Sequence, residues 1–324
     1  MSKKLVGFAG LFSVGALVLT ACGNDAETDG GADEEYDIAV VLKTTTSPYW
    51  LQVIGGVEDG AQEFGSSVTI GGATQESEVQ EQIDRINADL TRGPDALVVS
   101  PTQAEQLEPV LQSAVDEDIP VILVDTSIPD WEGAETFIGT DNLDLGSAIG
   151  DFVLEERDEG EMLVIRGVPG NPATDNRIDG ALEVLEGSGV EVVADLSADS
   201  DRAQARAATS DALQSNSDLS IIVAANDDMA LGAVEAVRGA GMDLEDFLIV
   251  GVDGTEDALN SIIAGELDAT MAQGAYEMGH RGIEEAVNVI EGDTIDAEIA
   301  IDTTLVTEEN AEDYLEQLQE QSAE

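Results

Sequence analysis

The sequence predicts an α/β protein made of two lobes, each containing a doubly wound parallel sheet. Continuous apolar runs alternate with amphipathic helical patterns along most of the chain, which is typical of buried parallel strands joined by helices. The alternation starts again in the second half of the chain, and 324 residues suffice for two domains of ordinary size. The apolar fraction of 43% is that of a globular protein with a core.

The first half of the chain shows four apolar strand patterns. In order, strands and helices are predicted at strand 38–42, helix 51–64, strand 68–70, helix 79–90, strand 96–99, helix 107–115 and strand 120–124. Polar residues follow three of these strands, namely Ser47, Ser100 and Asp125. Because ligands collect outside the carboxyl ends of parallel strands, these side chains are candidates for a binding site.

The second half of the chain repeats this pattern after a short strand at 137–139 and a polar turn at Thr140–Asn142. In order, the predicted segments are strand 162–165, helix 174–185, strand 190–193, helix 201–213, a strand ending at Asn226, a helix from Asp227, strands 248–253 and 269–273, and helix 276–290. His280, the only histidine, has no evident partner in the sequence and is predicted to be a surface or packing residue.

Two strand ends in the second half carry the strongest signal for a ligand site. Asn226 ends the run Ile221-Ile-Val-Ala-Ala, and Asp253 ends the run Leu248-Ile-Val-Gly-Val. Each residue also precedes a helix, so a simple helix-capping role is the alternative interpretation. If both side chains contact a ligand, the two strand ends form walls of one pocket.

The segments Asn226-Asp-Asp-Met-Ala-Leu-Gly-Ala233 and Val250-Gly-Val-Asp-Gly-Thr255 resemble the type I periplasmic sugar-binding proteins, in particular the ribose-binding members. The resemblance covers nearly all of residues 37 to 306. It implies two Rossmann-like lobes of periplasmic-binding-protein type I, joined by a three-crossing hinge. The implied N-terminal lobe is 37–140 plus 275–302, and the C-terminal lobe is 141–274 plus 303–324.

The resemblance also assigns roles to further residues. Tyr49 and Trp50 match aromatics that stack on a sugar ring, Arg177 matches the arginine of an Arg-x-x-Gly run that reaches the ligand, and Gln273 matches a glutamine at the second crossing. Each has a plainer interpretation. The aromatics could staple the helix to the core, Arg177 could be a solvated arginine, and Gln273 could be an ordinary amide at a sheet end.

Five positions depart from the ribose-binding pattern. Ser47 replaces an asparagine, Tyr49 and Trp50 replace two phenylalanines, Thr126 replaces an arginine beside the aspartate, and Ser200 replaces a phenylalanine in Ala198-Asp-Ser-Asp-Arg202. These changes argue against ribose itself. They favour another aldose, a sugar alcohol or an inositol.

The predicted set of side chains suits a ring of hydroxyl groups. Carboxylates accept hydrogen bonds from hydroxyls, amides both donate and accept, arginine donates, and aromatic rings cover the carbon face. The predicted ligand-binding residues are Ser47, Tyr49, Trp50, Ser100, Asp125, Thr126, Arg177, Asn226, Asp253 and Gln273. Because they come from both lobes, hinge closure would complete the pocket. We therefore expect binding of a monosaccharide or polyol by a monomer without cofactor or metal, for delivery to the permease and ATPase of an ABC importer.

The N-terminus indicates export. A basic start, Met1-Ser-Lys-Lys4, precedes an apolar run from Leu5 to Leu19 that is short for a membrane span, so residues 1–21 are predicted to be a signal peptide. The run Leu19-Thr-Ala-Cys-Gly23 resembles the bacterial lipobox, which implies lipidation of Cys22. The alternative is a plain signal peptide with a chance cysteine.

The resemblance to a lipoprotein implies an exported protein anchored on the outer face of the cytoplasmic membrane. Cys22 is the only cysteine, which excludes a disulfide within the chain. Residues 22–36 are acidic and lack an aliphatic run, so they are predicted to be a tether.

The charge balance is extreme, with 69 acidic against 12 basic residues and a net charge of -57. Lys43 is the only lysine after the signal peptide. Such a surface repels nucleic acid and anionic lipid. It resembles the surfaces of proteins that work in concentrated salt, where self-repulsion is screened. An ordinary acidic extracellular protein is the alternative.

Three other function classes were weighed. Repressors that share this fold carry an N-terminal helix-turn-helix, whereas this chain has a signal peptide and an acidic tether there. A carbohydrate-active enzyme would use paired carboxylates, but the sequence has no GxSxG elbow, phosphate loop or metal-ligand cluster. A protein that presents its ligand to a chemotaxis or quorum-signalling sensor stays open as an alternative to transport.

Overall fold

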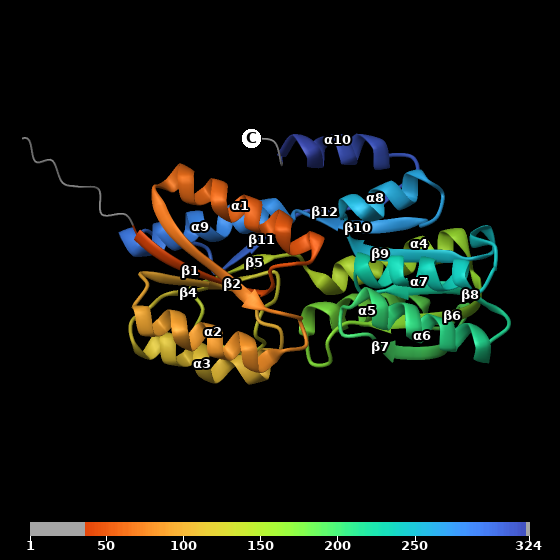
Figure 1. The fold of residues 1–324 in the computed structure, drawn as a ribbon, viewed down its shortest axis with the longest axis horizontal. Helices are drawn as coiled ribbons and strands as arrows, with labels where there is room; N and C mark the ends of the chain where they lie inside the picture. The colour runs from red at the N-terminus through yellow and green to blue at the C-terminus, as the bar shows by residue number, and fades with distance from the viewer. Residues whose placement is uncertain (1–35, 322–324) are drawn as a thin grey trace, which may run out of the picture. The chain divides into compact units, whose positions relative to one another are not determined.

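The computed structural model describes residues 36–321. The predicted signal peptide, Cys22 and all of the predicted tether except Tyr36 lie outside the described residues. The described chain forms two α/β lobes, each built on a six-stranded sheet (Figure 1). In residues 36–321, no helix is both long and apolar enough to cross a membrane.

The first sheet is parallel throughout and has the strand order β11-β5-β4-β3-β1-β2. Its strands are β1 (Tyr36–Thr44), β2 (Ser66–Ala73), β3 (Ala96–Val99), β4 (Val121–Val124), β5 (Thr136–Gly139) and β11 (Glu298–Ala300). Its helices are α1 (Pro48–Phe64), α2 (Val79–Arg92), α3 (Ala104–Asp116) and α9 (Ala275–Glu291). The predicted strand 68–70 is therefore the middle of a longer strand.

Side chains that alternate along β1 enter two separate cores, as expected for a strand buried on both faces. Ile38, Val40 and Leu42 pack with residues of α1 and α9. Ala39 and Val41 pack with residues of α2 and α3. The helices thus cover both faces of the sheet and leave the carboxyl ends of its strands as the edge that can meet a ligand.

The second sheet has the equivalent order β12-β10-β9-β8-β6-β7. Its strands are β6 (Glu159–Arg166), β7 (Gly189–Ser197), β8 (Leu219–Ala224), β9 (Leu248–Asp253), β10 (Ala269–Gln273) and β12 (Thr303–Thr307). The predicted parallel sheet is confirmed, with one exception that the sequence did not reveal: β12 runs antiparallel to β10. Residues 301–302 connect β11 of the first sheet to β12 of the second. The chain therefore enters the second sheet from the hinge side, and β12 runs in the opposite direction to β10.

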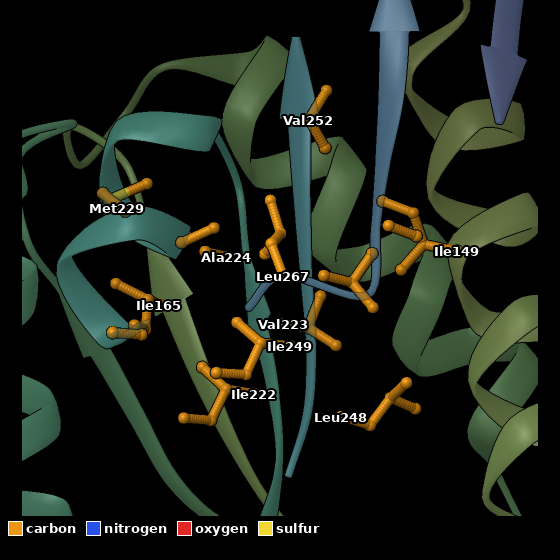
Figure 2. Packing of buried hydrophobic residues seen from close by; sticks show 14 of the residues in the cluster. Ile149, Ile165, Ile222, Val223, Ala224, Met229, Leu248, Ile249, Val252 and Leu267 are labelled. Atoms are coloured by element: carbon orange, nitrogen blue, oxygen red, sulfur yellow. The ribbon is translucent and has the colours of Figure 1, made fainter. Parts of the chain in front are cut away.

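The helices of the second lobe are α4 (Asn142–Glu156), α5 (Pro172–Leu185), α6 (Arg202–Ser215), α7 (Asp227–Gly239), α8 (Glu256–Ile263) and α10 (Ala311–Gln321), with a 3-10 turn η1 (Leu244–Asp246). Helix α4 packs against α5, α6 against α7, and α8 against α10. Figure 2 shows the core of this lobe, where Ile222 of β8 and Ile249 of β9 lie with Met229 of α7 and Ile149 of α4.

The chain passes between the two sheets three times. It leaves β5 for α4, leaves β10 for α9, and leaves β11 for β12. These crossings lie at residues 140–141, at Gly274 and at residues 301–302. Three backbone segments link the two lobes, each of which has its own core. These segments form the predicted hinge.

Glycines bring α1 and α9 into backbone contact. A Cβ atom added to Gly56 would lie 1.9 Å from the carbonyl oxygen of Tyr276, and one added to Gly279 would lie 2.1 Å from that of Val53. His280 also packs here. Its Nε2 lies 2.9 Å from Oε2 of Glu63 and its ring lies edge-on to Phe64, so the partner that the sequence did not reveal is on α1.

Gly56→Ala should lower the free energy of unfolding by roughly 1–3 kcal/mol, because the added methyl group forces α1 and α9 apart. Gly55→Ala is the matched control. Its Cβ would lie 3.9 Å from Tyr276, in ordinary contact, and alanine favours a helix over glycine by about 1 kcal/mol. Urea unfolding of both variants measures the difference. Equal stability of the two would contradict the close approach of the helices.

Candidate functional site

Facing strand ends of the two lobes border a polar cavity. The residues that line it are Lys43, Ser47, Tyr49, Trp50, Glu76, Asp125, Thr174, Arg177, Ser200, Asn226 and Asp253.

The structure brings the predicted site residues together, some in the cavity lining and the others directly behind it. Ser47, Tyr49, Trp50, Asp125, Arg177, Asn226 and Asp253 line the cavity. Ser100, Thr126 and Gln273 lie behind this lining and hydrogen-bond to it. The lining also contains four residues that were not predicted as site residues from the sequence, namely Lys43, Glu76, Thr174 and Ser200.

Asp125 is a buried carboxylate with a full set of donors. Its Oδ2 accepts hydrogen bonds from Lys43 Nζ at 2.8 Å, Ser100 Oγ at 3.1 Å and Thr126 Oγ1 at 2.8 Å. Burial alone would raise the pKa of Asp125, but the charges of Lys43 and Arg177 and these hydrogen bonds lower it to about 2. Asp125 is therefore ionised and firmly placed in the first lobe.

Lys43 is the cation of the first lobe that sequence analysis missed. It is only 3% exposed, and its Nζ lies 5.4 Å from the centre of the Trp50 ring as well as against Asp125. The replacement of an arginine by Thr126 therefore does not leave Asp125 without a cation. The signal in the sequence was that Lys43 is the only lysine after the signal peptide and ends an apolar run.

Tyr49 and Trp50 pack in the core, as the stapling interpretation predicts, and they also line the cavity. They pack edge-to-face with ring centres 4.9 Å apart and belong to the core between the sheet and α1, yet both also line the cavity. Tyr49 donates its hydroxyl to Asp125 Oδ1 at 3.1 Å, and Trp50 Nε1 donates to Glu76 Oε1 at 2.7 Å. Burial and then the charge of Asp125 raise the pKa of Tyr49, so its phenol stays protonated.

Arg177 is buried at 3% exposure, which excludes a solvated role. Its Nε donates to Asn142 Oδ1 at 2.8 Å, Nη1 donates to the carbonyl oxygen of Ala225 at 2.9 Å, and Nη2 donates to Gln273 Oε1 at 3.1 Å. The same guanidinium lies 3.4 Å from Asp253 and 3.8 Å from Asp125. It therefore connects the carboxylates of the two lobes.

Local sequence sets the position of Arg177. Asn171 caps α5 by accepting a hydrogen bond from the backbone N–H of Thr174, and Pro172 occupies the first turn. Gly146 of α4 allows the two helices to touch, because a Cβ atom there would lie 2.2 Å from the carbonyl oxygen of Arg177. A fixed helix thus holds the long side chain in the cavity wall.

Asn226 is both a helix cap and a cavity residue. Its Oδ1 accepts a hydrogen bond from the N–H of Met229 at 2.9 Å, which is the capping role. The side chain is 8% exposed and lines the cavity, and its Nδ2 donates to no atom of residues 36–321. The amide nitrogen is the group that remains for a ligand.

Asp253 faces the same cavity from the end of β9, where its backbone φ of 130° lies outside the usual regions for a non-glycine residue. Its Oδ1 accepts from Gln273 Nε2 at 2.9 Å and from Arg177, whereas Oδ2 accepts nothing from residues 36–321. The pKa of Asp253 lies well above its ordinary value. Burial is the largest cause, the charge of Arg177 opposes it, and the charges of Asp227 and Asp125 raise the pKa further.

Hydrogen bonds between the lobes show that the cleft is closed in this structure. Asn171 Nδ2 donates to the carbonyl oxygen of Thr102 at 2.9 Å, and Gln103 Nε2 donates to that of Pro169 at 2.7 Å. Ser47 Oγ donates to Asp228 Oδ2 at 3.3 Å. At the hinge, Thr140 donates to Gln273 Oε1 at 2.9 Å, so the crossing itself contacts the site network.

The cavity can exchange several hydrogen bonds with a small polyhydroxylated molecule. The lining contains the cations Lys43 and Arg177 and the acidic side chains Glu76, Asp125 and Asp253. Among residues 36–321, no group of three His, Cys, Asp or Glu side chains is arranged to hold a metal ion. Dense, mutually bonded polar groups in a closed cavity suit binding of a neutral hydroxylated ring.

Two lobes with the same strand order around such a cavity define a bilobed solute-binding protein. The chain belongs to the family described as periplasmic binding protein domain, whose model matches residues 38–294.

Curated relatives support this membership along almost the whole chain. A ribose import binding protein of Bacillus subtilis (strain 168) is 29% identical over 94% of this chain and 99% of its own length. The D-allose-binding periplasmic protein of Escherichia coli (strain K12) is 30% identical over 95% of this chain and 100% of its own length.

Solved structures share the fold. A carbohydrate transporter solute-binding protein of Agrobacterium radiobacter in complex with D-arabinose has a TM-score of 0.83 at 28% identity, covering 88% of this chain and 99% of its own. A Caulobacter myo-inositol-binding protein with bound myo-inositol has a TM-score of 0.80 at 28% identity, covering 86% of this chain and 95% of its own.

Asp227 is a buried carboxylate behind the cavity whose effect on stability can be measured. Its Oδ1 accepts from Thr270 Oγ1 at 2.7 Å, and its Oδ2 accepts from the N–H and hydroxyl of Thr255 at 2.8 and 3.0 Å. Burial outweighs these hydrogen bonds and raises the pKa of Asp227 to about 7. The folded protein therefore keeps this proton at pH values where the unfolded chain loses it.

Asp227 should make the free energy of unfolding fall as pH rises from about 4 to about 7, because only the folded state binds the proton in that window. Asp227→Asn removes the ionisation, so its free energy of unfolding should rise relative to the wild type by on the order of a few kcal/mol between those pH values. Urea unfolding at pH 4 and pH 7 in matched salt provides the test. Parallel pH profiles of the two proteins would show that Asp227 is ionised in the fold.

Proposed function

We propose that this protein binds a monosaccharide or cyclic polyol in the cavity between its lobes and presents it, in the closed state, to the permease and ATPase of an ABC importer. The observation that carries the proposal is a pair of largely buried side chains in the cavity lining, each with one polar atom that the protein does not bond. Asn226 Nδ2 and Asp253 Oδ2 have no partner among residues 36–321. Buried polar groups are normally hydrogen-bonded, so a ligand with hydroxyl groups is the partner they fit.

The comparisons support this ligand class. The similar proteins named above are described with ribose, D-allose, D-arabinose and myo-inositol, which are neutral and carry many hydroxyl groups. Tyr49 and Trp50 line the cavity and provide aromatic surface for the carbon face of such a ring. Neutral hydroxyls can donate to Asp253 and accept from Asn226 without adding a charge to the buried site.

We propose the lobe limits 37–140 plus 275–302 and 141–274 plus 303–324, with hinge closure as the step that encloses the ligand. The contacts of Asn171 and Gln103 across the cleft support this motion, because they join the lobes only when the cleft is shut. We also propose a monomeric, exported protein without catalytic activity, working in concentrated salt and anchored by lipid on Cys22. The charge of -57 and the lipobox-like run support the last two points.

A thermal-shift screen of the soluble domain in molar salt tests the proposed ligand class. The panel contains pentoses, hexoses, sugar alcohols, inositols and several amino acids. A ligand present at about 1,000 times its Kd should add about 4 kcal/mol to the free energy of unfolding, and hence raise Tm. A shift by one or more sugars or polyols supports the proposal, whereas shifts by amino acids alone would contradict the ligand class.

Asn226→Asp separates the binding role from the capping role. Aspartate is as good an N-cap as asparagine, so Tm should stay close to that of the wild type. The amide donor is replaced by an acceptor, so affinity for the sugar found in the screen should fall at least roughly tenfold. Asn226→Ala should lose both affinity and about 1 kcal/mol of stability. Unchanged affinity of Asn226→Asp by isothermal titration calorimetry would place the ligand elsewhere.

Cys22→Ser tests the proposed anchor. The variant lacks the thiol that would carry the lipid, so the protein should move from the membrane fraction to the medium when the full chain is expressed in its host. Cell fractionation with immunoblotting measures this, and Ser2→Ala in the predicted signal peptide is a control. Equal membrane retention of Cys22→Ser and the wild type would contradict lipidation at this residue.

A further inference from the structure

We propose that the cleft has a second, outer subsite, so that the ligand is a sugar or polyol bearing an uncharged substituent, such as a glycoside or an O-alkylated ring. The substituent passes Ser200 and lies in the cavity next to the one already described. This inference rests on the proposed function, because it assumes that the inner cavity holds a sugar or polyol ring.

The outer cavity adjoins the inner one, because Ser47, Glu76 and Ser200 line both. These three side chains mark the boundary at which a substituent would pass from one cavity to the other. Both lobes contribute to the outer lining, which consists of Thr44, Thr46, Ser47, Pro48, Thr74, Gln75, Glu76, Asp199, Ser200, Asp201, Arg202 and Asp228.

Ser200 is the residue that keeps this passage open. It lies in the loop between β7 and α6, and its side chain is a single hydroxyl group. In the ribose-binding pattern that the sequence resembles, a phenylalanine stands at this position. A ring there would fill space that the serine leaves to the ligand.

The Ser200 hydroxyl also lacks a hydrogen-bond partner in the protein, which supports contact with a ligand at this residue. Its Oγ is buried and makes no hydrogen bond with residues 36–321. Buried polar atoms without a partner are uncommon, and each calls for an explanation. An ether or hydroxyl oxygen of a ligand that crosses from the inner to the outer cavity would satisfy this atom.

The contacts that close the cleft leave room for such a substituent. Asn171 and Gln103 join the lobes without lining the outer cavity, and the Ser47–Asp228 hydrogen bond lies in its wall. The contacts of Asn171 and Gln103 that close the cleft therefore do not cross the proposed outer subsite.

The outer lining selects an uncharged extension. Glu76, Asp199, Asp201 and Asp228 face a single cation, Arg202, so a phosphate or carboxylate on the ligand would be repelled. The hydroxyl of Thr74, the amide of Gln75 and the mutually hydrogen-bonded hydroxyls of Thr44 and Thr46 give this lining neutral groups that can meet a hydroxylated substituent. We therefore expect neutral substituents to be accepted and sugar phosphates to be rejected.

The experiment compares matched probes on the wild type and on Ser200→Phe by isothermal titration calorimetry. The probes are D-glucose, D-galactose, D-allose and myo-inositol, the methyl β-glycosides of the three sugars, mono-O-methyl myo-inositols, cellobiose and lactose. For the wild type, at least one substituted probe should bind within about tenfold of its parent ring or more tightly. Ser200→Phe should weaken that probe at least about tenfold and leave the parent within about threefold.

The outcomes separate this inference from the proposed function. If parent rings bind and every substituted probe is more than about 100-fold weaker, the outer subsite is wrong and the proposed function stands. If Ser200→Phe weakens parent and substituted probes equally, or neither, the passage does not run past Ser200 and the inference is again wrong. If no sugar, polyol or substituted probe binds the wild type, the proposed function fails first.

Two further variants guard against a folding defect. Ser200 has a backbone φ of 59°, where a bulky residue is strained. Ser200→His at pH 8 adds a neutral ring to a residue type that tolerates this conformation better, and should reproduce the selective loss. Ser200→Gly suits the same φ and widens the passage, so it should keep the affinity for the substituted probe within about threefold.

Discussion

The arrangement of this cleft depends on one buried guanidinium. Arg177 donates hydrogen bonds to α4, to the end of β8 and to Gln273, and it faces a carboxylate from each lobe. A planar group with five donors in fixed directions can satisfy that many acceptors at once, which a lysine ammonium cannot. Because an unpaired buried charge is costly, this network also fixes the positions of its partners.

Lys43, the second buried cation, differs from Arg177 because its ionic partner lies in its own lobe. It balances Asp125 together with Ser100 and Thr126, so this carboxylate has a cation and two hydroxyl donors within its own lobe. In a chain with a net charge of -57, one of the few basic residues thus lies in the site. Salt screens charges on a surface, whereas a buried carboxylate needs a cation in contact.

The proposed hinge closure requires lobes that keep their shape. Glycines let α1 meet α9, and α4 meet α5, at backbone distance, so each lobe is tightly packed. Hydrogen bonds across the cleft, such as Asn171 to Thr102, join two such packed surfaces. In the proposed closure, the free energies of ligand binding and of these contacts both favour the closed arrangement.

The sequence by itself determined the α/β class, the positions of most strands and the polar residues at their carboxyl ends, because hydrophobic period and strand-end chemistry are local properties. Asp125, Asn226 and Asp253 could be named for that reason. Tertiary structure alone decided that β12 runs antiparallel, that Lys43 replaces the missing arginine beside Asp125, and that Asn226 caps a helix and lines the cavity at once. These outcomes depend on which distant side chains meet, and a pattern of neighbours along the chain does not contain that information.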